Sequence, residues 1–452
     1  MKKNGICMKP NILLILVDSF RADKCFGENK TSKIPNIEKL IKKGVYFEQA
    51  IGSSDYTVTG YGSIFSGLFP IDAGNSGMDY HKIFSKIPNY ISYLKNQGYH
   101  SYSLIASDEF ENITDFSNFF ENDEKSFDRA KTGLFFGLDS KILSNFEKEK
   151  MEEPWFYFIH LEDLHLPVRV PEKHKGKKYN ERYDLAVSEI DNFIGKILEK
   201  IDLENTLLIL TADHGDYILS GDDSIKDNFN QKVKTKLRTF VPKIAYDKAS
   251  IIKRNTQRQI KISTTKNPLE KRAIDSRTAK NRYLFDELIH VPLLFAGHNV
   301  PSRNTISDLV RLVDVFPTIL DLTGVKTPNR EIHGRSLLPL LKGEKMEEEP
   351  VYLENTIFQT SQKSPNACVG IRSSKFKYFR SLKNPKENVH LYDLTVDPLE
   401  ISNIANKKPE IISGMEKQIK KIKENSEKIE FDEMSKEEKN KIEEELKKLG
   451  YI

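Results

Sequence analysis

Residues 10–23 read PNILLILVDSFRAD, an apolar run that ends at Val17 and is followed at once by Asp18. A second run, NTLLILTADHGD at 205–216, leads into Asp213 and His214. Strands that are apolar throughout are typical of a parallel sheet with helices on both faces. Ligands bind such sheets beyond the carboxyl ends of the strands. The two stretches therefore predict the fold class and the edge of the sheet at which a site would form.

Strand-like and helix-like segments alternate along the chain, as expected for an α/β protein. Further strands are predicted at VYFEQAI (45–51), HSYSLIAS (100–107), PWFYFIHL (154–161) and HVPLLFAG (290–297). Helices are predicted within residues 34–44, 87–99, 183–201 and 312–324, three of them stopped by a glycine. The expected architecture is a mostly parallel central sheet sandwiched by helices.

The pattern changes after about residue 345. The segments PVYLENTIF, ACVGIRSSKFKYFRS and VHLYDLTVD are strand-like with short turns, which predicts a small antiparallel sheet. From Pro409 the chain is rich in Lys and Glu and helical in pattern. We expect a large α/β domain at 1–345, a small α+β subdomain at 346–408 and charged C-terminal helices at 409–452.

The charge of the chain is unevenly distributed. The formal net charge is +4, yet residues 224–282 contain 17 Lys/Arg and 4 Asp/Glu, a local charge of +13. The basic character therefore belongs to one segment, about 220–282. The three cysteines, Cys7, Cys25 and Cys368, fit neither a disulfide framework nor a zinc site. No apolar run suits a signal-peptide core or a membrane span, so we expect a cytoplasmic protein.

Several residues at the predicted strand ends could do chemistry. Asp213 and His214 could offer an oxygen and a nitrogen to a divalent metal ion, with Asp18 as a candidate third ligand. The alternative is that the acids cap helices and His214 lies on the surface. The segment HLEDLHLP adds His160 and His165 where the sheet opens to solvent, although each alone is more often structural than catalytic.

The stretch SSDYTVTGYGSIFSGLFP at 53–70 is rich in hydroxyl residues and glycine. It is either a polar turn ahead of a helix or the source of an attacking hydroxyl. The second interpretation needs a hydroxyl at a helix N-terminus, where the dipole and the free N–H groups favour the oxyanion and its anionic target. A neighbouring metal ion would lower the pKa of that hydroxyl.

Together these motifs resemble the sulfatase family of the alkaline phosphatase superfamily. The resemblance is carried, in order, by PNILLILVDSFRAD, TVTGYGSIFSGLFP, HLEDLHLP, TADHGD, YLFDELIHVPLLFAG, LVDVFPTILDLTG, HGRSLLPLL and LYDLTVDPLEISNIA, from about Pro10 to about Ala405. It implies an alkaline phosphatase-like fold and a metal-dependent hydrolase. One divalent ion, Mn²⁺, Zn²⁺, Mg²⁺ or Ca²⁺, is implied, held by Asp18, Asp213 and His214.

The same resemblance assigns the nucleophile. Counting back from the Ser-Gly pair of SGLFP places it at Thr57, with Thr59, Ser54 and Ser63 as rivals if the register differs. True sulfatases have Cys or Ser there, oxidised to formylglycine, and an Arg four residues later, where this chain has Tyr61.

These departures change the expected chemistry. The family's second acid after Asp18 is Ser19 here, and SLIASDEF lacks the family's Lys-x-His. Threonine cannot give the aldehyde hydrate that expels sulfate, because its Cβ carries a methyl group. Family members with a plain threonine process phosphoesters, so a phosphoester is the preferred substrate.

The remaining site residues also follow from the resemblance. His165 matches the family's histidine that contacts the transferred group, and His160 is assigned to the substrate. The basic segment returns at TAKNRYLFDE, where the family often has Lys or His beside that group. Lys280 is the best candidate there and Arg282 a weaker one. The segment is either a solvated excursion or a cationic rim for an anionic substrate.

Three functions remain open. The first is a metal-dependent hydrolase of phosphate or sulfate esters, with phosphate preferred. The second is a transferase of the phosphoethanolamine or phosphoglycerol type, which usually carries membrane spans. The third is a non-catalytic, anion-binding relative. The expected partner is an anionic ester, such as a glycan or a lipid headgroup, and nucleic acid is not favoured. Metal content tests the third function, and the products formed with added alcohol separate the first two.

Overall fold

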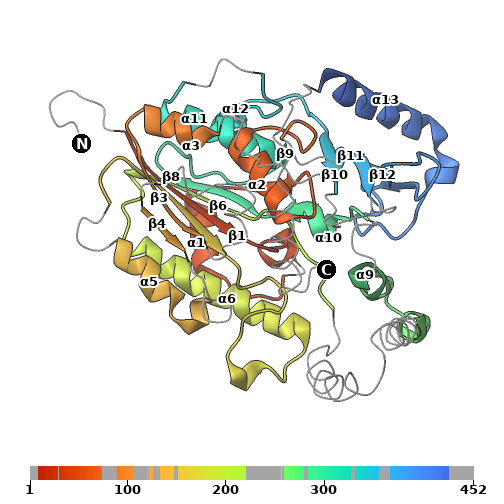
Figure 1. Cartoon of the computed structure of the whole chain (residues 1–452), viewed down its shortest axis with the longest axis horizontal. Helices are drawn as coiled ribbons and strands as arrows, with labels where there is room; N and C mark the ends of the chain where they lie inside the picture. The colour runs from red at the N-terminus through yellow and green to blue at the C-terminus, as the bar shows by residue number, and fades with distance from the viewer. Residues whose placement is uncertain are drawn as a thin grey trace, which may run out of the picture.

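The computed structural model describes residues 9–28, 30–73, 89–105, 120, 122–125, 133–146, 151–219, 256, 259–278, 283–326, 331–355 and 367–426. These residues form a large sheet between two layers of helices, with a smaller sheet beside it (Figure 1). This is the expected fold class.

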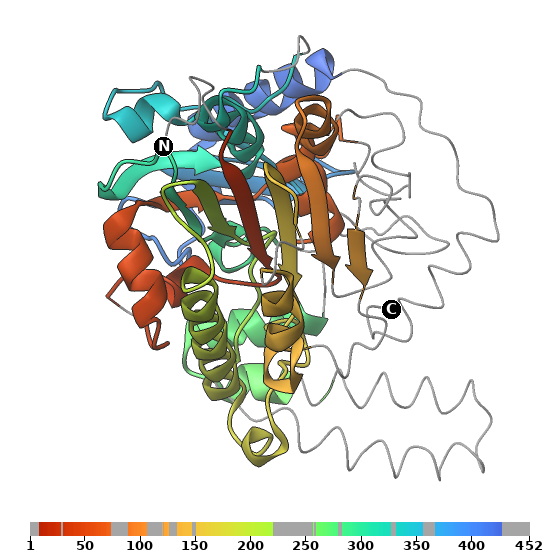
Figure 2. The ribbon, with the colours of Figure 1, turned by 90° about the vertical axis from the view of Figure 1, so that its left-hand side faces the viewer.

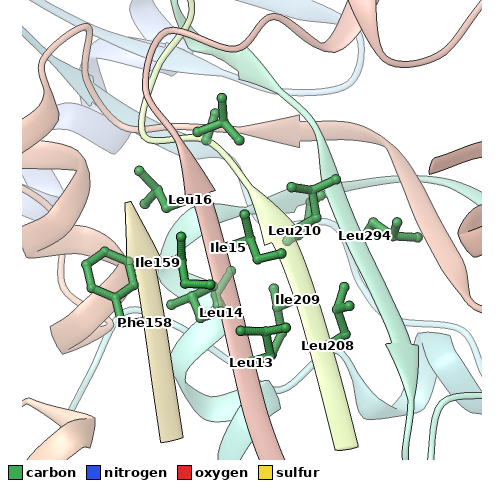
Figure 3. Close-up of a cluster of buried hydrophobic side chains, with 14 of the residues drawn as sticks. Leu13, Leu14, Ile15, Leu16, Phe158, Ile159, Leu208, Ile209, Leu210 and Leu294 are labelled. Carbon is green, nitrogen blue, oxygen red and sulfur yellow. The ribbon is translucent and has the colours of Figure 1, made fainter. Parts of the chain in front are cut away.

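The large sheet is built on three fully buried strands. β1 (Asn11–Val17) lies between β5 (Trp155–Leu161) and β6 (Thr206–Thr211) and runs parallel to both. Figure 3 shows their Leu and Ile side chains packed around these strands. Burying one such side chain is worth about 1.5–3 kcal/mol, so this apolar core holds the strand ends in place.

The other strands extend the sheet on both sides. Its order is β4-β3-β5-β1-β6-β8-β2-β7, with β9 paired to β2. The added strands are β2 (Val45–Ile51), β3 (His100–Ile105), β4 (Asn122–Lys125), β7 (His290–Val291), β8 (Leu293–Gly297) and β9 (Asn304–Arg311).

Strand β4 was not predicted, and two further features of this sheet were not expected. β8 runs antiparallel to both β6 and β2, because an apolar run reports burial and not direction. β9 was not predicted, because the first half of NTISDLVR is polar and partly exposed. The sheet is therefore mixed, although β4, β3, β5, β1 and β6 are parallel.

Helices cover both faces of the large sheet (Figure 1). One layer contains α1 (Pro35–Lys43), α5 (Leu138–Asn145) and α6 (Tyr179–Leu198). The other contains α2 (Thr57–Ser66), α3 (Tyr90–Asn96), α11 (Val315–Thr323) and α12 (Leu338–Lys342). Helix α1 begins at Pro35 and, as predicted, is followed by Gly44. No helix among the described residues is long and apolar enough to cross a membrane.

The smaller sheet is antiparallel, in the order β10-β11-β12-β13. Its strands are β10 (Val351–Glu354), β11 (Cys368–Arg372), β12 (Phe376–Ser381) and β13 (His390–Asp393). Helix α13 (Pro409–Asn425) packs against it and lies at the opposite end of the molecule from α6 (Figure 2). The short helix α10 (Asp286–Ile289) and α9 (Pro268–Thr278) complete this side.

Several polar contacts join the smaller sheet to the rest of the molecule. The Glu354 amide at the end of β10 donates to the Ser53 carbonyl, 2.9 Å away, in the loop before α2. The fully buried Lys377 Nζ lies 2.6 Å from Asp286 Oδ1 and 2.7 Å from Glu400 Oε1. The first of these contacts holds the loop ahead of α2 against the smaller sheet.

Candidate active site

The register of the central strands brings two acids level with each other. Leu16 pairs with Thr211 across β1 and β6, and Asp18 and Asp213 each lie two residues further on. On the other side of β1, the Asp18 amide donates to the Leu161 carbonyl of β5 at 2.9 Å. The carboxyl ends of three parallel strands thus meet at one point, as the sequence predicts for a ligand site.

Asp18, Asp213 and His214 converge at this point. Each offers one ligand atom, these atoms lie within 4.8 Å of one another, and all three residues are buried. Asp213 Oδ1 accepts hydrogen bonds from the Ser19 amide at 3.3 Å and the His214 amide at 2.8 Å. Asp213 Oδ2 is buried and has no hydrogen-bond partner within the part of the chain that the structure describes. A buried carboxylate oxygen of this kind suits a metal ion.

The ring of His214 is oriented by its neighbour. Its Nδ1 lies 2.7 Å from the Gly215 carbonyl, which can only accept, so Nδ1 carries the proton. In the neutral ring the lone pair of Nε2 then faces the site, 3.1 Å from Thr57 Oγ1 and 3.7 Å from Asp18 Oδ1. Metal-binding histidines commonly donate their other N–H to a carbonyl in this way.

The electrostatics of the cluster also favour a cation. Burial, followed by the charge of Asp213, raises the pKa of Asp18 to about 6. Burial lowers the pKa of His214, but the charges of Asp213 and Asp18 outweigh it and raise that pKa to about 9. Both shifts arise because two buried carboxylates share one site. The residues therefore fit a divalent ion, while their role as its ligands stays a prediction.

Thr57 is the first residue of α2, and the extended Tyr56 precedes it. Its hydroxyl is thus at the N-terminus of a ten-residue buried helix, where backbone amides lack acceptors within the helix and the dipole favours an anion. A Cβ added at Gly60 would lie 2.8 Å from Asp213 Cβ, so only glycine lets α2 approach Asp213 this closely. The rivals lie elsewhere, with Ser54 before the helix and Thr59 and Ser63 further along it.

The structure separates the other predicted site residues. His160 is fully buried, with Nε2 3.9 Å from Asp18 Oδ2, a position that favours support of Asp18 over contact with substrate. His165 is partly exposed in the turn after β5, and its Nδ1 lies 2.8 Å from the Leu166 carbonyl. The substrate roles of both histidines stay predictions. Lys280 and Arg282 lie outside the described residues, as does most of the basic segment.

Two residues of the site were not expected from the sequence. Ser19, considered only as a missing acid, donates its hydroxyl to Asp18 Oδ1 at 2.7 Å and its amide to Asp213, so it links both acids. Asp55 lies two residues before Thr57, and burial raises its pKa to about 6 although the nearby His214 lowers it. Nothing in the sequence around Asp55 indicates that this acid is buried near His214, because an acid in a hydroxyl-rich loop is usually exposed to solvent.

Comparisons with known proteins were made for the whole chain. A family model described as Sulfatase matches residues 10–325, and one described as N-sulphoglucosamine sulphohydrolase, C-terminal, matches residues 277–425. Arylsulfatase K from Mus musculus is 27% identical over 154 residues, which are 33% of this chain and 28% of that protein. Arylsulfatase K from Homo sapiens is 30% identical over 154 residues, with the same shares of 33% and 28%. The match thus spans under a third of the length of these relatives.

Solved structures resemble the chain over nearly its full length. A 2-O GAG sulfatase has a TM-score of 0.65 at 16% identity and covers 96% of both chains. The phosphonate monoester hydrolase of Agrobacterium radiobacter has a TM-score of 0.63 at 15% identity and covers 92% of this chain and 96% of its own. At these identities the likeness concerns the fold.

Proposed function

Because the chain belongs to the sulfatase family, we propose that it is a metal-dependent hydrolase of anionic esters with Thr57 as nucleophile and a preference for phosphoesters. The observation that carries this proposal is the 3.1 Å contact between Thr57 Oγ1 and His214 Nε2 at the start of α2. The same histidine lies beside the buried Asp18 and Asp213. The Thr57 hydroxyl, the N-terminus of α2 and the candidate cation site therefore lie next to one another.

Asp18, Asp213 and His214 would hold the ion. Two carboxylates and one imidazole suit Mn²⁺, Mg²⁺, Zn²⁺ or Ca²⁺. When bound, such an ion supplies positive charge that lowers the pKa of a nearby hydroxyl and offsets the charge of the ester oxygens. The N-terminus of α2 adds partial positive charge from backbone amides on the same side.

The proposed reaction has two displacements. Thr57 Oγ1 attacks phosphorus, the new O–P bond forms as the bond to the substrate alcohol breaks, and the alcohol leaves with the proton lost by Thr57. Water then attacks the same phosphorus, the bond to Thr57 breaks, and the threonine hydroxyl is restored as phosphate leaves. If the second acceptor is an alcohol in place of water, the same residues perform transfer.

The chemistry of threonine favours phosphorus over sulfur. A formylglycine hydrate can release a bound sulfate by elimination, because the carbon that carries the sulfate also carries a second hydroxyl, whereas threonine Cβ carries only one. A threonine phosphate can instead be opened by in-line attack, which a metal ion assists. A phosphonate monoester hydrolase shares the fold, which supports phosphorus chemistry on this scaffold.

A sulfate ester is the second candidate substrate. Arylsulfatase K is among the sequence relatives, a 2-O GAG sulfatase shares the fold, and a similar structure contains D-glucosamine-2-N,6-O-disulfate as its substrate. These relatives support a sulfated glycan as the substrate class. A phosphorylated sugar or lipid headgroup is the matching class for the phosphoester proposal.

The test is a hydrolysis screen of the full chain loaded in turn with Mn²⁺, Mg²⁺, Zn²⁺ and Ca²⁺. Paired dyes carrying a phosphate monoester, a phosphate diester and a sulfate ester on the same leaving group isolate the transferred group. We expect phosphoester turnover that Thr57→Ala abolishes and Thr57→Ser partly keeps. Sulfate turnover as fast as phosphate turnover would overturn the preference, and full activity of Thr57→Ala would overturn the nucleophile. Added glycerol reports transfer by its phosphorylated product.

A further inference from the structure

We propose that Tyr179 and Tyr183, one turn apart on α6, are positioning residues for the metal site. This inference rests on the proposed function, because it concerns the affinity of that site for its ion. Two loops carry the predicted ligands: the first loop, residues 18–21, and the second loop, residues 213–217. Each tyrosine hydroxyl binds one of these loops, so a single helix face fixes both.

Tyr183 binds the first loop at two points. Its hydroxyl donates to the Ser19 carbonyl at 2.6 Å and accepts from the Arg21 amide at 3.1 Å. The Tyr183 side chain is fully buried, so neither hydrogen bond competes with water. The Ser19 carbonyl and the Arg21 amide lie beyond the end of β1, where the strand ladder no longer supplies partners. One tyrosine hydroxyl satisfies both groups.

The first loop needs such support because Ser19 has a left-handed backbone, with φ of +63°. For a residue with a side chain this conformation costs roughly 1–2 kcal/mol and persists only where several contacts enforce it. Tyr183 holds the Ser19 carbonyl, while Asp213 accepts from its amide and Asp18 from its hydroxyl. The conformation that links the two acids therefore depends on the tyrosine.

Tyr179 binds the second loop. Its hydroxyl donates to Asp216 Oδ2 at 3.0 Å, and Asp216 Oδ1 accepts from the Tyr217 amide at 2.7 Å. Arg21 joins the two loops, because its Nη1 donates to the Asp216 carbonyl at 3.3 Å. Tyrosines at i and i+4 lie on one face of a helix, which matches the spacing of the two strand ends.

Helix α6 is itself fixed to α1 and to the segment that follows the first loop. Asp191 accepts from the Asn36 amide at 3.0 Å and the Ile37 amide at 2.8 Å, at the start of α1. Asp184 lies 3.0 Å from Lys24 Nζ, just beyond the first loop. The tyrosines therefore work from a rigid element, which lets them hold the loops within a fraction of an ångström.

The experiment measures Mn²⁺ binding by electron paramagnetic resonance of the free ion, together with the melting temperature with and without Mn²⁺. The variants are Tyr183→Phe and Tyr179→Phe, each of which removes only a hydroxyl. Tyr157→Phe is the matched control, because its buried hydroxyl accepts from Asn145 Nδ2 at 3.0 Å, away from both loops. The full chain is used throughout.

We expect the Mn²⁺ dissociation constant to rise about tenfold in Tyr183→Phe and less in Tyr179→Phe, as for other residues that orient metal ligands. The control should lose melting temperature but keep its affinity and its full gain in melting temperature on adding Mn²⁺. The inference is overturned if the two variants bind Mn²⁺ as the wild type does, or if all three lose affinity in proportion to stability. A wild type that binds no Mn²⁺ would overturn the metal proposal itself, and this inference with it.

Discussion

His214 presents one nitrogen to the site, and that nitrogen can do only one of two things. Nε2 lies 3.1 Å from Thr57 Oγ1 and 3.6 Å from Asp213 Oδ2, while Nδ1 faces the Gly215 carbonyl. Nε2 therefore either holds a metal ion or accepts the proton of the threonine hydroxyl. The two roles require different chemical properties of the side chain, and substitution can separate them.

Asparagine at position 214 distinguishes the two roles, because an amide oxygen can bind a metal ion but is a very weak base. We expect His214→Asn to bind Mn²⁺ within about tenfold of the wild type and to keep measurable turnover, whereas His214→Ala should lose both. Calorimetric metal titration and phosphoester hydrolysis provide the two readouts. Normal metal binding without turnover in His214→Asn would identify the histidine as the base.

Gly60 is the second residue whose replacement is informative. A Cβ there would lie 2.8 Å from Asp213 Cβ and 3.0 Å from the Asp213 carbonyl, so alanine must push α2 away from the site. Gly60→Ala should lower the free energy of unfolding by about 1–3 kcal/mol and weaken metal binding. Gly414→Ala is the control, since it lies in α13 with nothing within 4 Å and should stabilise by about 0.5–1 kcal/mol. Urea unfolding measures the free energy of unfolding of both variants. A Gly60→Ala variant as stable as the wild type would refute the close contact between α2 and Asp213.

The sequence predicts the site residues that directly follow strands, but not the residues that contact the site from a distant helix. Asp18, Asp213 and His214 follow apolar runs, so their position along the chain predicts their convergence. Tyr183 sits in an ordinary amphipathic helix, and nothing in its sequence neighbourhood shows that its hydroxyl meets Ser19. Such a contact depends on how helix and sheet are placed in space, which periodicity does not encode.

Among the elements, the junction between α10, β12 and the loop at Glu400 contains a cluster of buried charges. Lys377 is fully buried and pairs with Asp286 and Glu400, and Arg372 Nη2 lies 3.2 Å from Asp286 Oδ2. Burial lifts the pKa of Asp286, but Lys377 and Arg372 outweigh it and hold that pKa well below its usual value. Burial raises the pKa of Glu400 to about 7, although Lys377 lowers it.

Lys377→Met should destabilise the protein by about 3 kcal/mol at pH 7.5, because Glu400 loses its cation while Asp286 keeps Arg372. Glu400 then takes up a proton in the folded state more readily than in the unfolded chain, where its pKa is about 4.5. A carboxyl whose pKa is raised by folding adds stability as the pH falls from its folded to its unfolded pKa. The deficit should therefore shrink between pH 7.5 and pH 5, and urea unfolding of variant and wild type at both values checks this. An equal deficit at both values would show that Glu400 does not depend on Lys377.

The elements themselves were predictable to the extent that they carry periodic apolar residues. β1, β5 and β6 are apolar throughout, and α1 is bounded by Pro35 and Gly44. The antiparallel direction of β8 was not predictable, because a buried strand looks the same from either end. The half-exposed β9 has no clear apolar pattern in its sequence. It forms a strand because it pairs with β2, and this pairing cannot be seen from the sequence of β9 alone.

At the scale of the whole molecule, the excess positive charge is concentrated in the basic segment, about 220–282. Residues 226–254 hold 9 Lys/Arg and 2 Asp/Glu, and they lie outside the described residues. The far end of the segment is anchored, because Arg272 of α9 donates to the carbonyls of Leu399 and Glu400, each at 3.0 Å. A deletion that tests the segment should therefore leave α9 in place.

Deleting residues 226–254 should weaken the salt dependence of turnover on a polyanionic ester, such as a phosphorylated oligosaccharide. Attraction between separated charges is screened within about 10 Å at 0.1 M salt, so the wild-type KM should rise with NaCl and the variant's much less. A small phosphate ester serves as control, and its kcat should be unchanged by the deletion. An unaltered salt response in a folded variant would mean that the segment does not guide the substrate.

The hydrogen bond between Glu354 and Ser53 has a consequence for how the protein is made. Ser53 leaves the ribosome about 300 residues before Glu354, which at roughly 5–20 residues per second is a delay of about 15–60 s. During that interval the hydroxyl-rich loop lacks the strand that fixes its backbone, although β1, β5 and β6 can already pair. The nascent chain can thus bring Asp18 and Asp213 together well before the backbone ahead of Thr57, the proposed nucleophile, is held in place.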